Sequence, residues 1–401
     1  MEIVVQKYGG TSVTTHESRT RIAQNAIELK KQGKSPVIVV SAIGRNGDPY
    51  ATDTLINFFK SANEQYSDRN LDFLLTCGEM ISAAVVANTI EGLGYKAVAL
   101  TGHQAGMITD THFGNANVTY VDTHKILKHL ENDCIVVVTG FQGMTAAGEL
   151  TTLGRGGSDT TAAVLGVELD AEAIEIYTDV DGVMTADPRM VKNAQLLKTI
   201  SYEECYQMAI DGAKVVDHKA IDIAKKGNKP LIIKNTFSDS AGTIIGREEG
   251  SIEGNKEHVV TAVTSKNAIT QVLVFSTSDD PVARQLLNEL ESHKISIDLI
   301  NFFEDRKIFT VPSEKSDDVV GILEKLRLKY KITSECSKVT VVGNKIHGVP
   351  GVMKRLVFAL ARANVEILQS SDSYSTISCL IKSEHVQDAL LALHAEFGLN
   401  D

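Results

Sequence analysis

Residues 2–14 read EIVVQKYGGTSVT and join an apolar segment to a pair of glycines. The residues before Lys7 are predicted to form a short buried strand, and the residues after the glycines begin a helical pattern. Gly9 or Gly10 alone would be enough for a tight turn. Lys7 ends the strand, and an unpaired ammonium near a sheet edge needs an anion. The corner therefore indicates a site for an anion as well as a turn.

The chain that follows this corner alternates between strand-like and helix-like segments. The β-branched segments are SPVIVVSA (35–42), KAVAL (96–100), CIVVVTGFQG (134–143), AIEIYTD (173–179) and KPLIIKN (229–235). Helical patterns cover residues 20–32 and 68–91. This alternation predicts an α/β fold class, with a layered α/β/α domain built on a mostly parallel sheet.

The pattern changes at GREEGSIEGNKEH (246–258), which is charged and without periodicity, so we expect a linker there. Beyond it, Val282 and Leu286 have apolar counterparts about 70 residues later at Val352 and Leu356. Each copy reads strand, helix, strand, strand, helix, which is the order of a ferredoxin-like α+β fold. The predicted domains are 1–246, 260–335 and 336–401.

Length and composition limit the class of protein. The 401 residues are enough for two or three domains, and 43% hydrophobic and 23% charged residues are ordinary for a soluble globular chain. A formal charge of −11 argues against a nucleic-acid surface or anchoring on anionic lipid. The five cysteines show no pairing pattern, the N-terminus enters a strand at once, and no apolar run reaches membrane-spanning length. We therefore expect a cytoplasmic protein with no nucleic-acid or membrane partner.

Three glycine-bearing corners lie in the first domain: KYGGTS (7–12), TTLGRGGSDTTAA (151–163) and YTDVDGVMTADPR (177–189). Glycines let a backbone approach a ligand closely, and amides at a helix N-terminus favour an anion. No GxxxxGK[ST] loop occurs, and GLGYKA at Gly92 ends a helix rather than opening one, so neither common nucleotide motif applies. DVDG lacks the spaced carboxylates of a calcium loop.

Taken together and in this order, the three corners resemble the amino-acid kinase family and, within it, the aspartokinases. The resemblance covers essentially the whole chain, because aspartokinases carry two ACT domains of ferredoxin-like plan after the kinase domain. It implies ATP-dependent phosphorylation of the side-chain carboxylate of L-aspartate to 4-phospho-L-aspartate, with ATP as co-substrate and Mg²⁺ bound mainly through the nucleotide phosphates. It also implies feedback inhibition through the ACT domains.

The chemistry of such a site suits these residues. A carboxylate nucleophile is already ionised at neutral pH, so the protein must align two anions and offset the charge that develops on the phosphoryl oxygens. Lys7 supplies one positive charge, and Lys214 is expected to supply a second. Asp159 is expected either to orient Lys7 or to receive the substrate ammonium, and Arg155 to grip a substrate carboxylate.

Glu79 lies in FLLTCGEMISAAVV, where nearly every neighbour is apolar. A carboxylate buried there needs a partner, whereas on an exposed helix face it would need none. By the family resemblance, Glu79 binds the amino group of aspartate.

The family's other site residues carry over motif by motif. For catalysis they are Lys7, Asp159 and Lys214; for ATP, Lys7, Tyr8, Gly9, Gly10, Thr178, Asp179, Met184, Arg189 and Lys214. For aspartate they are Ser41, Thr52, Glu79, Phe141, Arg155, Ser158 and Asp159; for an amino-acid effector, Asp280 and Val352. No residue is predicted to ligate a metal directly. Met184 stands where many relatives have tyrosine, and Phe302 where many have glutamine.

Three questions stay open at this stage. The chain could instead be another amino-acid kinase, acting on glutamate or acetylglutamate, or a non-catalytic amino-acid sensor. The effector could be lysine, diaminopimelate or threonine. Because a single ferredoxin-like unit leaves an open sheet edge, we expect a homodimer or a dimer of dimers through the ACT domains. A chain cut near Gly246 is expected to lose inhibition.

Overall fold

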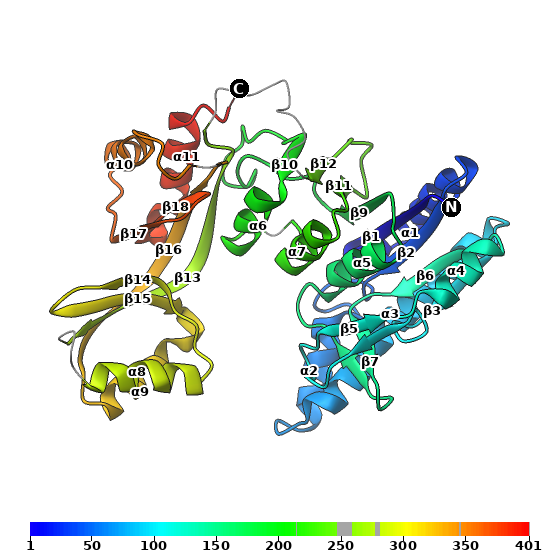
Figure 1. Ribbon diagram of the computed structural model, residues 1–401, viewed down its shortest axis with the longest axis horizontal. Helices are drawn as coiled ribbons and strands as arrows, with labels where there is room; N and C mark the ends of the chain where they lie inside the picture. Colours follow the sequence, from blue (N-terminus) through cyan, green and yellow to red (C-terminus); the bar gives the residue numbers. More distant parts are fainter. Residues whose placement is uncertain (214, 247–258, 277–280, 345, 401) are drawn as a thin grey trace. The chain divides into compact units, whose positions relative to one another are not determined.

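The computed structural model describes residues 1–213, 215–246, 259–276, 281–344 and 346–400, with the side chains of residues 281 and 283 left aside. These residues form two compact units (Figure 1). The first comprises Met1–Val183, Leu196–Ala209 and Lys214–Gly250, and the second Met184–Gln195, Ile210–Ala213 and Ser251–Asp401. Residues 247–258 of the predicted linker lie outside the described residues.

The main sheet of the first unit has the strand order β10-β12-β11-β9-β1-β2-β6-β3. Its neighbours pair in parallel, except for the antiparallel pair β11 and β12. The predicted mostly parallel sheet is therefore confirmed. The strands are β1 (Ile3–Tyr8), β2 (Ser35–Val40), β3 (Ala97–Leu100), β6 (Ile135–Thr139), β9 (Ala173–Thr178), β10 (Thr199–Ser201), β11 (Leu231–Asn235) and β12 (Thr243–Gly246).

Helices cover both faces of this sheet. One face packs on α1 (His16–Lys31) and α3 (Asp68–Gly92) through a core that includes Tyr8, Ile22 and Val86. The other face carries α5 (Gly157–Glu168), which contacts β1, β2 and β9 and packs beside α7 (His218–Lys226). Successive side chains of a strand point to opposite faces, so Tyr8 enters the α1 side while Lys7 points toward α5. The α/β/α layering follows.

Smaller elements complete the first unit. A second sheet of the first unit has the strand order β5-β4-β7-β8. Its strands and the remaining helices are β4 (Met107–Thr109), β5 (Val118–Val121), β7 (Gln142–Thr145), β8 (Leu150–Thr152), η1 (Gly10–Val13), α2 (Thr52–Ala62), α4 (His124–Glu131) and α6 (Tyr202–Ile210).

Helix α3 is long and apolar enough to cross a membrane by length and composition, so the prediction that no such segment exists was wrong. It packs against α1, α2, β3, β6 and β8, and half of its most apolar window is buried inside the protein. It also buries the carboxylates of Asp72 and Glu79. These are the properties of a core helix.

The second unit contains a sheet of order β14-β15-β13-β16-β18-β17. The predicted repeat is present, because β15 and β18, like α9 and α11, start about 70 residues apart. Each copy has the predicted order of strand, helix, strand, strand, helix. The elements are β13 (Ala262–Phe275), α8 (Pro281–Ser292), β14 (Asp298–Phe302), β15 (Arg306–Pro312), η2 (Ser313–Lys315), α9 (Ser316–Lys325), β16 (Lys329–Val342), α10 (Val352–Arg362), β17 (Gln369–Asp372), β18 (Thr376–Lys382), η3 (Ser383–His385) and α11 (Val386–Glu396).

Strands β13 and β16 each run through both ferredoxin-like copies. The second half of β13 pairs with β15 and with the first half of β16, while residues 262–266 pair with residues 338–342. The first half of β13 thus completes the sheet of the second copy, although the predicted boundaries put it in the first. The chain therefore interleaves the two copies.

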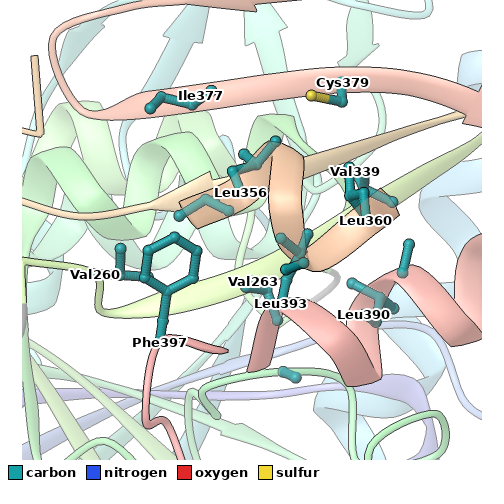
Figure 2. Packing of buried hydrophobic residues seen from close by; sticks show 14 of the residues in the cluster. Val260, Val263, Val339, Leu356, Leu360, Ile377, Cys379, Leu390, Leu393 and Phe397 are labelled. Atoms are coloured by element: carbon teal, nitrogen blue, oxygen red, sulfur yellow. The ribbon is translucent and has the colours of Figure 1, made fainter. Parts of the chain in front are cut away.

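The core of the second copy also takes up part of the predicted kinase domain. Leu356 and Leu360 of α10 pack with Leu390 and Leu393 of α11 (Figure 2). Ala186 and Val191 belong to the same buried cluster, and they come from the segment Met184–Gln195. The predicted first domain, residues 1–246, therefore includes a segment that folds with the second unit.

Candidate active site

The predicted site residues of the first unit gather where four neighbouring parallel strands end. Lys7 is the next-to-last residue of β1, Ser41 follows β2, Phe141 comes shortly after β6, and Thr178 ends β9. The sheet order β9-β1-β2-β6 places these carboxyl ends side by side. Ligands of open α/β sheets bind at this edge.

Lys7 and Asp159 form the charged centre of this edge. Lys7 Nζ lies 2.7 Å from Asp159 Oδ1, and both side chains are largely buried. The second oxygen of Asp159 accepts a hydrogen bond from the backbone N–H of Asp217 at 3.0 Å. Asp159 lies in the first turn of α5, so the helix N-terminus adds positive potential at the same place. Of the two roles expected for Asp159, this contact fits the orientation of Lys7.

The glycines after Lys7 bring two backbones together. A side chain at Gly10 would place its Cβ 2.6 Å from the carbonyl oxygen of Gly44, so only glycine fits there. The N–H of Gly44 in turn donates to the carbonyl of Gly10 at 3.1 Å. Gly9 lies beside the Lys7 ammonium, because a Cβ built at Gly9 would be 3.7 Å from Lys7 Nζ. The backbone of Gly9 therefore lies next to a fixed positive charge.

Glu79 is 2% exposed, so the alternative of an exposed helix position was wrong. Its Oε1 accepts a hydrogen bond from the backbone N–H of Ala42 at 3.1 Å. Its Oε2 is buried and has no hydrogen-bond partner among the described residues. Burial raises the pKa of Glu79 to about 8, and the Ala42 bond offsets this only in part. The free oxygen could accept a hydrogen bond from a cationic donor.

The central loop, residues 151–163, supplies Arg155 and Ser158, and Phe141 lies between β6 and β7. Arg155 is exposed and forms no ion pair within the part of the chain that the structure describes. Ser158 is buried and packs closely against Gly140. A Cβ built at Gly140 would lie 2.7 Å from Ser158 Oγ. Phe141 has φ of 70°, a left-handed conformation that is unusual for an aromatic residue. Its N–H donates to Thr161 Oγ1 and its carbonyl accepts from Leu153, which fixes the strained backbone.

Other predicted contacts are placed as follows. Thr52 begins α2 and is half-buried, and Thr178 is half-buried at the end of β9. Asp179 is exposed and pairs with Arg45 at 2.6 Å. Tyr8 is fully buried, its ring stacks on Tyr177, and its carbonyl accepts the N–H of Ser41 at 3.1 Å, so the side chain is turned away from this edge.

The remaining predictions lie in the second unit or outside the described residues. Met184 and Arg189 belong to the segment that packs with the second unit, where Arg189 pairs with Asp187 at 2.6 Å. Lys214 and Asp280 lie outside the described residues. Val352 is buried at the start of α10 and lines a cavity of about 410 Å³, together with Arg355 and Phe358.

The sequence reasoning missed Asp72, which fixes the central loop. Its carboxylate accepts hydrogen bonds from the backbone N–H groups of Gly114 and Thr152, both at 2.9 Å, and from Thr152 Oγ1 at 2.7 Å. Asp72 precedes Glu79 by two helical turns on an otherwise apolar helix face. That spacing of two acids was the signal available in the sequence.

No group of three His, Cys, Asp or Glu side chains in the described parts of the chain could hold a metal ion.

Comparison with known proteins identifies the family. The family model of the amino acid kinase family matches residues 2–235, and an ACT-domain model matches residues 331–395. The chain is 39% identical over 403 residues to aspartokinase 1 of Bacillus subtilis (strain 168), with 100% of both chains covered. The chain belongs to the aspartokinases. A second aspartokinase relative, from Geobacillus stearothermophilus, is 38% identical over all of this chain and 98% of its own length.

Solved aspartokinase structures have the same fold. One is E. coli aspartokinase III in complex with aspartate and ADP, with a TM-score of 0.81, 23% identity, and coverage of 99% of this chain and 100% of that chain. Another is aspartate kinase from Synechocystis, with 30% identity, a TM-score of 0.56, and coverage of 99% of this chain and 69% of that one. Both confirm the aspartokinase architecture of this chain.

Proposed function

We propose that this chain transfers the γ-phosphoryl group of ATP to the side-chain carboxylate of L-aspartate and that amino acids regulate it through the ACT domains. The supporting observation is the Lys7–Asp159 pair at the N-terminus of α5, beside the half-buried backbone of Gly9 and Gly10. The full-length similarity to aspartokinases selects aspartate as the substrate.

In this proposal Lys7 acts on the phosphoryl oxygens. Its ammonium is held in place by Asp159, which is itself fixed by the N–H of Asp217. A preorganised charge stabilises the transition state without reorganisation at the moment of transfer. The amides of the glycine corner and of the start of α5 face the same anion. Mg²⁺, carried on the nucleotide, would neutralise part of the phosphate charge.

Two charged side chains hold the substrate groups that do not react, which are the ammonium and the α-carboxylate of aspartate. The free Oε2 of Glu79 receives the aspartate ammonium, and the exposed Arg155 guanidinium grips its α-carboxylate. Ser41, Ser158, Phe141 and Thr52 complete the pocket. No general base is required, because the attacking carboxylate is ionised at neutral pH. The site therefore works by alignment and electrostatics.

A substrate panel tests the reaction. Purified protein is assayed for ADP release with ATP, Mg²⁺ and aspartate, glutamate or acetylglutamate in turn. We expect turnover with aspartate alone. Turnover with glutamate instead would support the other amino-acid kinases, and ATP binding without turnover would support a sensor.

Regulation and assembly belong to the same proposal. The buried Val352 and its cavity at the start of α10 are one candidate effector site, with lysine, diaminopimelate and threonine as candidate ligands. The exposed Ile300, Phe302 and Phe303 lie on or next to β14, which is an edge strand of its sheet. An exposed apolar edge favours pairing with another copy, so we propose a homodimer or a dimer of dimers, acting in the cytoplasm.

A further inference from the structure

Arg45 lies on the loop between β2 and α2 and pairs with a residue on the far side of the glycine corner. Its Nη2 donates to Asp179 Oδ2 at 2.6 Å, and the two side chains are 69% and 45% exposed. Arg45 is not among the site residues that the sequence predicts, whereas Asp179 is an expected ATP contact. The pair therefore joins a side chain without an assigned role to the proposed nucleotide site.

The order of the strands places this ion pair across the glycine corner. In the order β9-β1-β2, the strand that leads into the corner lies between the other two. Asp179 directly follows β9. On the opposite side, the N–H of Gly44, which comes after β2, donates to the carbonyl of Gly10 at 3.1 Å. The side chain of Arg45 therefore reaches from the β2 side of the corner to its β9 side.

The loop that carries Arg45 is fixed at its backbone. Asp48 Oδ2 accepts the N–H of Arg45 at 2.8 Å, and Thr54 Oγ1 of α2 accepts the N–H of Gly47 at 2.9 Å. Gly44 has φ of 91°, and a Cβ built there would lie 2.4 Å from Asp48 Oδ2, so the turn closes tightly on this carboxylate. A fixed backbone with an exposed side chain lets the guanidinium change partners and still stay at the corner.

A nucleotide phosphate is a stronger partner for this guanidinium than Asp179 is. An ion pair between two exposed side chains contributes little to stability, so it opens at low cost. The terminal phosphates of a nucleoside triphosphate carry more negative charge than one carboxylate, and arginine binds phosphate through two parallel N–H···O bonds. Exchange of the carboxylate for a phosphate is therefore favourable.

We propose that Arg45 binds the terminal phosphates of the nucleotide, and that it exchanges Asp179 for them. This inference rests on the proposed function, in which the nucleotide phosphates lie against the backbone of Gly9 and Gly10. The pair with Asp179 holds the guanidinium at the corner until a phosphate takes it over. The exchange also releases the Asp179 carboxylate for its own expected contact with ATP.

The test is calorimetric titration of the full-length protein with the β,γ-imido analogue of ATP and Mg²⁺, with AMP, and with aspartate. AMP carries the same nucleoside but lacks both terminal phosphates. For Arg45→Met we expect about ten-fold weaker binding of the analogue, with AMP and aspartate affinities within about two-fold of those of the unchanged protein. Arg45→Lys keeps a charge but loses the paired N–H groups, so a loss of about three-fold is expected.

Two further variants separate phosphate binding from other effects. Arg69→Met is the matched control, because Arg69 at the start of α3 is 51% exposed and pairs with Glu149 at 2.5 Å, and neither residue is an expected site residue. All three affinities should stay within about two-fold in this variant. Arg45→Met with Asp179→Asn also removes the carboxylate that loses its partner, and the loss of analogue binding should persist.

Four results would overturn the proposal. They are unchanged binding of the analogue in Arg45→Met, equal losses for the analogue and AMP, a loss confined to aspartate, and normal analogue binding in the double variant. The last would mean that Arg45 only neutralises Asp179. Analogue binding without turnover in the unchanged protein would contradict the proposed function alone, because the titrations do not depend on turnover.

Discussion

At the residue scale, the candidate site depends on charges that are largely buried and fixed. Lys7 and Asp159 are held at 2.7 Å beneath the edge of the sheet, while Arg155 stays exposed. A fixed charge costs little to use during phosphoryl transfer, whereas an exposed arginine can adapt to an incoming carboxylate. The two kinds of charge therefore predict different kinetic effects.

Replacing Lys7 by alanine removes the charge that we propose faces the phosphoryl oxygens. We expect kcat to fall by about 100-fold or more, with a much smaller change in the KM for aspartate. Steady-state kinetics measures both constants. Lys34→Ala serves as the control. Lys34 immediately precedes β2, so it lies away from the carboxyl ends of the strands, and it pairs with the exposed Glu172. A Lys7→Ala protein with normal kcat would exclude Lys7 from catalysis.

Arg155→Ala and Glu79→Ala are expected to raise the KM for aspartate strongly, because each leaves a charged group of the substrate without its partner. ADP affinity, measured by calorimetry, should hardly change in either variant. Equal losses for both ligands would mean that these residues support the fold rather than bind the substrate.

The KM for aspartate is expected to depend on pH through Glu79. With a pKa of about 8, the buried carboxyl is mostly neutral at pH 6, and an ammonium must draw a proton off it to bind. The KM should therefore fall as pH rises toward 8, by up to about ten-fold per pH unit. In Glu79→Gln this dependence should disappear. A KM that is flat between pH 6 and 8 in the unchanged protein would contradict the assignment.

At the element scale, strands and helices with strong patterns were predictable. The strand segments 35–42, 96–100, 134–143, 173–179 and 229–235 all contain observed strands. In β2 and β6 nearly every residue is buried, as expected for apolar runs inside a parallel sheet. The short strands of the second sheet, such as β4 and β8, were not predictable, since three residues carry no usable periodicity.

The candidate site was predictable to the extent that local motifs determine it. Lys7, Asp159 and Glu79 lie in motifs and could be named from the sequence, whereas Asp72 accepts hydrogen bonds from Gly114 and Thr152, which are distant in sequence. Tyr8 shows the limit clearly. Its motif indicates a nucleotide contact, but strand alternation turns its ring into the core, where it stacks on Tyr177.

Helix α11 contains a buried histidine, His394, through which we expect the stability of the protein to depend on pH. The sequence did not indicate this. His394 is buried, its Nε2 lies 2.9 Å from Thr185 Oγ1, and its Nδ1 lies 2.6 Å from Asn400 Oδ1. Burial lowers the pKa of His394, and the bond to Asn400 offsets this only in part. Its folded-state pKa lies below the value of about 6.5 in the unfolded chain, so unfolding takes up a proton at low pH.

We therefore expect the stability that His394 contributes to be fully present above pH 6.5 and to be lost as the pH falls below it. Urea unfolding at pH 7.5 and 5.5 measures this, with a smaller midpoint difference expected in His394→Gln. His385→Gln is the control, because His385 is at the surface end of η3. If both variants and the unchanged protein lose the same stability on acidification, the effect belongs to other groups.

At the scale of the whole molecule, the regulatory unit includes segments of the predicted kinase domain. Residues 184–195 supply Ala186 and Val191 to the core around α10 and α11, and this segment carries Met184 and Arg189, two expected ATP contacts. A chain cut near Gly246, which the sequence predicts to lose inhibition and stability, would also lose the buried partners of this segment.

For a protein ending at Gly246 we expect loss of kinase activity as well as loss of inhibition. Without its buried partners the segment 184–195 exposes Val191 and has no fixed position, so ATP binding should weaken at least ten-fold. ADP titration and turnover of the purified fragment measure this. Full activity without inhibition would show that residues 184–195 hold their place without the ACT domains.

The interleaved strands also determine when, during synthesis, the protein can become complete. Residues 262–266 of β13 pair with residues 338–342, and the core that encloses Val191 includes Phe397 and Leu399. A ribosome makes the chain from its N-terminus, and domains fold as their residues emerge. Here residues 262–266 and the segment 184–195 must wait for partners that are translated well after them. A nascent chain therefore cannot fix these segments early, and translation products truncated before residue 338 are predicted to be inactive and to expose apolar surface to chaperones and proteases.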